Sequence, residues 1–225
     1  MNISILSTLA LKGVLDRFRA DLEKSLGAQL QPRFDATQAI LKLLKEGSPQ
    51  ARCDVLILTT EAMQELQKAG QVNHMQVLGS SGVGIAVRAG APKPDIRSLE
   101  SFKRAIASAA SVAHSKVGAS GLYFASLVDS IPLEIKKRVV VEKGPVGRAV
   151  AAGEAEIGVQ QLCELAPVSG IDIVGPLPEA IQRVTHFAAG VPVNAGNPQG
   201  ASALIAHFRS ERIRAGMVEG GIEPA

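Results

Sequence analysis

The sequence predicts an α/β protein with two lobes, each built around a mostly parallel sheet and joined to the other by two hinge crossings. Short apolar runs rich in β-branched residues alternate with segments of helical period, which is typical of parallel sheets covered by helices on both faces. The alternation occurs in two sets, and a stretch rich in glycine and proline at residues 79–94 separates them.

The first lobe begins with a strand followed by an amphipathic helix. The apolar run of the strand covers residues 3–7, and apolar residues from Leu11 to Leu22 then recur with the spacing of one helix face. Gly27 is the expected end of this helix, because glycine readily adopts the left-handed conformation that closes helices. The other elements expected in this lobe are strands at 29–34 and 55–58, a helix around Ile40 and Leu44 that ends at Gly47, a helix at 61–69 and a strand beginning at Val77.

The second lobe repeats the alternation. Its expected elements are a helix at 98–110, strands at 112–115, 139–141, 157–159 and 171–174, a helix that opens after 118–121 and a helix at 146–152. We expect the apolar run 187–193 to return the chain to the first lobe, where the helix 201–208 docks. Residues 1–80 plus 190–225 are therefore assigned to lobe 1 and residues 81–189 to lobe 2, with a ligand cleft between them.

The composition excludes several classes of protein. The chain has 225 residues, of which 46% are hydrophobic and 20% charged, so it can bury a sizeable core and is not disordered. Aromatic residues make up only 3%, which argues against stacking sites for single-stranded nucleic acid. The 24 Lys and Arg residues are scattered among 21 Asp and Glu residues, so we expect no nucleic-acid partner.

The two cysteines, Cys53 and Cys163, cannot form a disulfide framework and have no metal-ligand spacing. We expect both to be inert buried thiols, and we expect neither a metal nor a cofactor. No run of about 18 apolar residues predicts a membrane span, and no signal peptide precedes Ile3. The expected location is cytoplasmic for the chain as written, or periplasmic if Met1 replaces a removed leader.

Polar and small residues stand where strands end and helices begin, at Ser7–Thr8, Ala36–Thr37, Thr59–Thr60 and residues 115–121. A helix amino terminus presents unpaired N–H groups and the positive end of the helix dipole, so each turn is a candidate anion site. Ligands of open α/β sheets bind beyond the carboxyl ends of the strands. The alternative is that these hydroxyl groups only cap their helices.

The segment from Ser115 to Gly121 has the strongest ligand-binding character. Gly118 and Gly121 would allow the backbone to approach an anion, Ser115 and Ser120 offer hydroxyl groups, and Lys116 offers positive charge.

Two further features of the second lobe leave alternatives open. Gln160 and Gln161 close a strand, where their amides could serve a ligand or cap the next turn. A general base would have to be His114, Lys116 or Glu164. The alternation of the strand turns His114 away from Ser115, which favours a structural histidine, and the catalytic residues stay unassigned.

These segments resemble the type II periplasmic-binding-protein family, in its molybdate-binding-protein-like branch. The resemblance covers nearly the whole chain and rests on Ser7–Thr8, residues 34–37, residues 53–59, and the run 153–158 followed by Gln160–Gln161. It implies two Rossmann-like lobes whose hinge strands close on a small anion. It also implies ligand contacts at Ser7, Thr8, Thr37, Ser115, Ser120 and Gln160 or Gln161. Thr37 stands where the family usually has a serine, and a glutamine stands where it has a tyrosine.

The runs 82–96, 115–121 and 158–161 resemble leaderless members of this family, and the same superfamily contains an aconitate isomerase, which moves an allylic proton between the trans and cis tricarboxylates. We prefer non-catalytic binding of a small oxyanion or carboxylate. The alternative is an isomerase acting on a tricarboxylate such as aconitate, and a third hypothesis is an intracellular sensor with the same cleft. A monomer is expected, with an ABC permease as partner if the protein is exported. The expected ligand-binding residues are Ser7, Thr8, Thr37, Thr59, Ser81, Ser115, Lys116, Gly118, Ser120, Gly121, Gln160 and Gln161.

Overall fold

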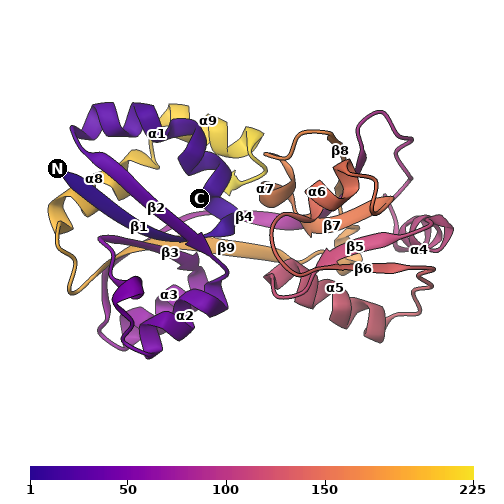
Figure 1. The fold of residues 1–225 in the computed structure, drawn as a ribbon, viewed down its shortest axis with the longest axis horizontal. Coiled ribbons are helices and arrows are strands. Elements are labelled where there is room, and N and C mark those ends of the chain that lie inside the picture. The colour runs from indigo at the N-terminus through magenta and orange to yellow at the C-terminus, as the bar shows by residue number, and fades with distance from the viewer. The chain divides into compact units, whose positions relative to one another are not determined.

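The computed structural model describes residues 1–225 and divides them into two compact units (Figure 1). Unit 1 comprises Met1–Ser80 and Thr185–Ala225, and unit 2 comprises Ser81–Val184. The chain leaves unit 1 within strand β4 (Val72–Arg88) and returns at the start of strand β9 (Val184–Pro192). The return lies earlier than the expected boundary at 189–190, because β9 already pairs with β3 of unit 1 from Phe187 onward.

Unit 1 is a sheet with helices on both faces. Its parallel strands are β1 (Asn2–Thr8), β2 (Gln29–Asp35) and β3 (Val55–Thr59), and β9 runs antiparallel beside β3. Its helices are α1 (Lys12–Leu26), α2 (Thr37–Lys45), α3 (Thr60–Lys68), α8 (Pro198–His207) and α9 (Glu211–Glu219), with short 3-10 turns η1 (Leu9–Leu11) and η2 (Pro49–Ala51). Helices α8 and α9 pack with α1, whereas α2 and α3 share the core cluster of the opposite face (Figure 1).

Helix α1 follows the sequence pattern that predicts it. Val14, Leu15, Phe18 and Leu22 are its buried residues, and they recur at helical spacing. Gly27 ends the helix in the left-handed conformation, with φ of 59°, as predicted.

Unit 2 is a second α/β sheet. Its parallel strands are β5 (Val112–Ser115), β6 (Arg138–Val141) and β7 (Ile157–Gln161), while β4 pairs antiparallel with β7 and with β8 (Ile171–Pro176). Its helices are α4 (Leu99–Ser108), α5 (Ala119–Ser130), α6 (Val146–Ala151) and α7 (Leu162–Leu165), with a 3-10 turn η3 (Glu179–Ile181).

The two faces of the unit 2 sheet have separate cores. Phe102 of α4 and Phe124 of α5 pack with Ile157 and Val159 on one face. Ala113 packs with α6 residues, including Val146, on the other face. The parity of a residue within β5 or β7 therefore shows which helices its side chain meets.

The structure adds elements that the sequence pattern did not predict. Helix α9 follows α8, helix α7 follows β7, and the short strand β10 (Glu223–Pro224) pairs with β4. The crossing expected at 79–94 lies within β4, which is continuous strand up to Arg88. A Cβ on Gly84 would lie 2.3 Å from Leu162 Cδ2, so glycine there allows α7 to pack against the strand. No helix is both long enough and apolar enough for a transmembrane span.

The buried Asp54 carboxylate joins three segments of unit 1. Asp54 Oδ2 accepts hydrogen bonds from the Ser4 backbone N (2.8 Å) and from Ser4 Oγ (2.6 Å), and Oδ1 accepts one from the Asn197 backbone N (2.7 Å). Burial by itself raises the pKa of Asp54, but these hydrogen bonds stabilise the ionised form and lower the pKa below its ordinary value.

We expect Asp54→Asn to lower the free energy of unfolding by about 2 kcal/mol at pH 7, because an amide cannot accept all of these hydrogen bonds. The pKa is lower in the folded state, so the stabilisation is complete above the unfolded pKa of about 4 and is lost as pH falls through the folded pKa. Urea denaturation at pH 7 and pH 3 measures both effects.

Asp21→Asn is the matched control, because Asp21 forms an exposed ion pair with Arg212. It should change stability by no more than about 0.5 kcal/mol. An Asp54→Asn protein as stable as the wild type at pH 7 would contradict the assigned role of Asp54.

Candidate functional site

The carboxyl ends of β1, β2 and β3 lie at one edge of the unit 1 sheet. Thr8 pairs in register with Asp35 of β2, and Ser7 pairs with Ile57 of β3. Helix α2 begins at Thr37 and helix α3 at Thr60, directly beyond that edge. The parallel register therefore brings three of the four predicted polar turns to the same edge of unit 1.

The hydroxyl groups at this edge differ in whether they already make hydrogen bonds within the protein. Ser7 is fully buried and Ser7 Oγ donates to the Thr8 carbonyl oxygen (2.9 Å). Thr59 caps α3, its Oγ1 accepting from the Ala62 backbone N (3.4 Å), which is the capping alternative. Thr8 makes no cap hydrogen bond with its side chain, and α2, which begins at Thr37, has the N-cap Ala36 and no side-chain cap. Thr60 Oγ1 is buried without any hydrogen-bond partner.

The parallel strands of unit 2 align their ends in the same way. Ser115 of β5 pairs with Val141 of β6, and His114 pairs with Val159 of β7, which places Ser115 beside Gln160. Helix α5 follows from this edge, with Gly118 as its N-cap. The predicted segment 115–121 and the predicted glutamine pair therefore share one edge of unit 2.

The glycines of segment 115–121 make room for Ser115. Ser115 Oγ accepts a hydrogen bond from the Gly118 backbone N (3.1 Å). A Cβ on Gly121 would lie 1.9 Å from the Ser115 carbonyl oxygen, and one on Gly118 would lie 2.6 Å from Ser115 Oγ. The sequence predicts that both glycines allow the backbone to approach an anion. In the structure, the group that approaches both glycines is Ser115. Ser120 is buried in the first turn of α5, close to the amides that have no partner within the helix.

Two predicted ligand residues are engaged with other parts of unit 2. Lys116, expected to bring positive charge to the ligand, is exposed and forms an ion pair with Glu142 (Nζ to Oε1, 3.0 Å). Ser81 lies within β4, and its Oγ accepts from the Cys163 backbone N (3.1 Å) in the first turn of α7.

Gln160 and Gln161 are both buried, with exposed fractions of 2% and 3%, but they face opposite sides of the sheet. Gln160 Oε1 accepts from the backbone N of Val146, the first residue of α6 (2.7 Å), and Gln160 Nε2 donates to Glu164 Oε2 (2.5 Å). Gln161 has the parity of Ile157 and Val159, on the face with α4 and α5. Gln161 Nε2 is buried without a partner. Gln160 therefore caps the first turn of α6, whereas the Nε2 donor of Gln161 has no acceptor.

The Glu164 carboxylate is partly buried beside Gln160. Burial raises the pKa of Glu164 to about 7, and the hydrogen bond from Gln160 opposes this shift. Glu164 can therefore gain and lose a proton near neutral pH. The sequence did not predict this raised pKa.

His114 and the two cysteines have structural roles. The His114 ring packs against Phe124, with centroids 5.5 Å apart, and His114 Nδ1 lies 3.1 Å from the Ser115 carbonyl oxygen. Both cysteines are free and buried, as predicted, and burial raises the pKa of Cys53 to about 12. No group of three or more His, Cys, Asp or Glu side chains is arranged to hold a metal ion.

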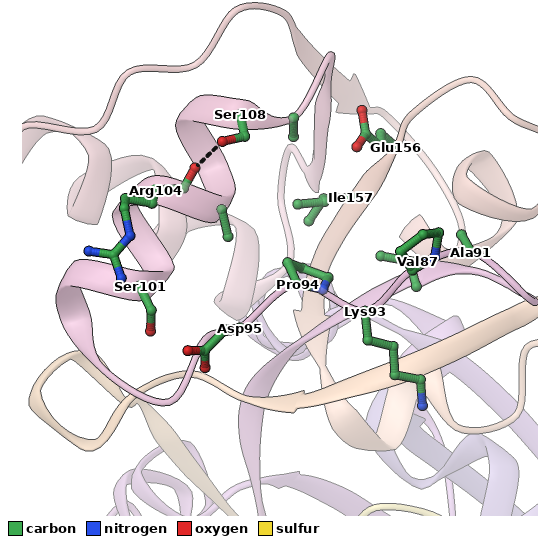
Figure 2. A pocket seen from close by; sticks show the side chains of 13 residues that line it. Val87, Ala91, Lys93, Pro94, Asp95, Ser101, Arg104, Ser108, Glu156 and Ile157 are labelled. Atoms are coloured by element: carbon green, nitrogen blue, oxygen red, sulfur yellow. Dashed lines mark hydrogen bonds between the residues drawn. The ribbon is translucent and has the colours of Figure 1, made fainter.

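A pocket of about 540 Å³ lies elsewhere in unit 2, between α4 and the segment 91–95 (Figure 2). Figure 2 shows Arg104 and Ser108 of α4 with Asp95 and Glu156 around it. Glu156 already accepts a hydrogen bond from the Ala110 backbone N (2.7 Å). Ile157 lines this pocket at the amino end of β7, so the pocket is at the opposite end of the strand from the polar edge. We place the candidate site at the carboxyl ends of the strands.

Comparison with known proteins defines the family. Residues 3–223 match the sequence model of the family described as bacterial extracellular solute-binding protein. The chain belongs to this family. It is 34% identical to an aconitate isomerase from Pseudomonas sp. over 233 residues, which cover 99% of this chain and 87% of the isomerase.

Solved structures show that this family member has the fold expected from the sequence. The chain superposes on the periplasmic molybdate-binding protein of Azotobacter vinelandii with a TM-score of 0.73 and 15% identity, covering 98% of both chains. It superposes on the substrate-binding domain of a putative molybdenum ABC transporter from Clostridium difficile with a TM-score of 0.72 and 16% identity, covering 100% of this chain and 99% of that one. These similarities confirm the type II periplasmic-binding-protein fold.

We expect Gly121→Ala to destabilise the protein by about 2 kcal/mol, because its Cβ would overlap the Ser115 carbonyl oxygen. Glycine to alanine inside a helix ordinarily stabilises by up to about 1 kcal/mol, so the sign of the change is diagnostic. Urea denaturation measures it. Ser126→Ala, on the exposed side of α5, should stay within about 0.5 kcal/mol of the wild type. A Gly121→Ala protein more stable than the wild type would show that α5 is free to move from Ser115.

Proposed function

We propose that this protein binds a small anion, an oxyanion or a carboxylate, through neutral donors at its polar turns. The observation that carries the proposal is the buried, unpartnered amide nitrogen of Gln161 at the edge where α5 begins. A buried donor without an acceptor costs about 1–3 kcal/mol, and a bound anion would supply the acceptor.

The charge distribution favours neutral donors over a fixed counter-charge. Lys116 is paired with Glu142 on the surface, so its charge is already partly compensated. The first-turn amides of α5 and the hydroxyl of Ser120 remain as donors in unit 2. The corresponding hydroxyl groups of unit 1 are those of Thr8, Thr37 and Thr60. Helix amino termini stabilise anions through their dipoles and free amides, and they need no lysine or arginine.

The relatives support an anionic ligand. The family consists of solute-binding proteins, and the structural neighbours include proteins described as binding molybdate and sulfate. In this proposal the candidate ligand-binding groups of unit 2 are Ser115, Ser120, the amides of 119–121 and Gln161, and unit 1 has candidates of its own in Ser7, Thr8, Thr37, Thr59 and Thr60. An ABC permease would receive the solute if the protein is exported.

Isomerisation of a tricarboxylate is the second candidate function. The specific observation in its favour is the 34% identity to an aconitate isomerase across 99% of the chain. Aconitate is a carboxylate anion, so both candidates use the same donors. They differ in whether a proton-transfer group acts on the bound molecule.

We expect a small anion to raise the melting temperature by about 5–10 °C at a concentration near 100 times its Kd, because it binds only the folded state. A thermal-shift screen of molybdate, sulfate, cis-aconitate and trans-aconitate measures this. Ser120→Ala and Thr37→Ala should each remove at least half of the rise, while Ser126→Ala should keep it. If both site variants keep the full rise, the site lies elsewhere.

We expect Gln161→Met to separate stability from binding. Methionine has nearly the length of glutamine and removes the unpartnered buried amide, so the ligand-free variant should melt at the wild-type temperature or higher. The same change removes a donor to the anion, so the ligand-induced rise should be lost. A variant that melts well below the wild type, or that keeps the rise, would contradict the role of Gln161.

A further inference from the structure

The Glu164 carboxylate is a feature that anion binding does not need. A site of neutral donors gains nothing from a partly buried carboxylate, which would repel an anion when ionised. Glu164 nevertheless lies in α7, directly beyond the polar edge of unit 2. We therefore look for a function of Glu164 other than binding the ligand.

Gln160 sets the orientation of this carboxylate. Because Gln160 Oε1 accepts from the Val146 backbone N, its Nε2 must face Glu164 as a donor. This donor engages Glu164 Oε2 and leaves Glu164 Oε1 with no hydrogen-bond partner in the chain. Gln160 in turn lies beside Ser115, at the start of the segment that leads into α5. One carboxylate oxygen is therefore fixed by Gln160, and the other is free in the first turn of the helix that follows the carboxyl end of β7.

We propose that Glu164 is the proton-transfer group that isomerises an unsaturated tricarboxylate bound at this edge. The inference rests on the second candidate function. Glu164 Oε1 removes a proton from the methylene carbon next to the double bond, and the electron pair spreads over the allylic carbons and the attached carboxylate. The same carboxylic acid then returns the proton to the other end of the allylic system, and the double bond moves. Atoms and electrons balance without any further reactant.

The environment of Glu164 suits this exchange. With its pKa raised to about 7 by burial, the carboxylate can accept and return a proton near neutral pH. Helix α7 packs against β7, α6 and β8, and its Leu162 lies against Gly84 of β4, whose titratable residues are His74 and Arg88. Strand β7 carries no charged residue, Arg148 of α6 forms no ion pair, and Asp172 of β8 accepts from the Gly90 backbone N. The influences on the pKa of Glu164 are burial and the hydrogen bond from Gln160, and no opposite charge is among them.

The other two candidate bases are less well placed. The His114 ring is packed against Phe124, and its Nδ1 faces the Ser115 carbonyl oxygen. Lys116 is paired with the exposed Glu142.

The test compares Glu164→Gln and Glu164→Asp with the wild type in two assays. The first follows isomerisation of trans-aconitate by proton NMR, and the second measures the rise in melting temperature with trans-aconitate. We expect Glu164→Gln to keep the rise and to lose at least 100-fold in kcat, and Glu164→Asp to recover part of the loss. Wild-type kcat/KM should increase with pH through an inflection near pH 7, which Glu164→Gln abolishes. Glu154→Gln, the same change at an exposed site in unit 2, should leave kcat within about twofold.

The outcomes separate this inference from the binding proposal. A wild-type protein that binds trans-aconitate without converting it overturns the role of Glu164 and leaves anion binding intact. Turnover by Glu164→Gln within threefold of the wild type also overturns it. No melting shift with any anion, and no turnover, refutes the proposed function and the inference together.

Discussion

The parallel register of two strand triplets is the constraint on which the rest of the structure depends. Because β1, β2 and β3 run in the same direction, the turns that follow them open at one edge of the unit 1 sheet. Strands β5, β6 and β7 do the same in unit 2. Helix amino termini then face the same way as those edges, so each unit concentrates free amides and hydroxyl groups at one place.

The adjacent residues Gln160 and Gln161 at the end of β7 differ in whether their amide groups have hydrogen-bond partners. Alternation along the strand places Gln160 toward α6, where its amide is satisfied on both sides, and Gln161 toward α4 and α5, where its nitrogen is not. The satisfied amide organises Val146 and Glu164. The unpartnered amide nitrogen of Gln161 costs free energy in the folded protein.

Close packing accounts for several residues that a motif search would assign to a ligand. Gly118 and Gly121 look like an anion-binding loop, yet the space that their missing side chains leave is occupied by Ser115. Ser81 looks like part of a polar run, and its hydroxyl oxygen accepts from the first turn of α7. Lys116 looks like a counter-charge, and it pairs with Glu142. In each case the nearest partner comes from the same unit.

The sequence by itself determined the alternation of strands and helices, the polar turns and the fold, because hydrophobic period and glycine stops are local properties that survive in any tertiary context. The sequence did not predict α9, because Gly216 within it weakens its helical pattern. The position of α9 depends on a close contact with α1: a Cβ on Gly216 would lie 2.2 Å from Phe18 Cζ. The sequence did not decide between Gln160 and Gln161 or single out Glu164. Those assignments depend on which groups meet across strands and helices. Their hydrogen-bond partners come from distant segments, and the desolvation that raises the pKa of Glu164 exists only once those segments pack together.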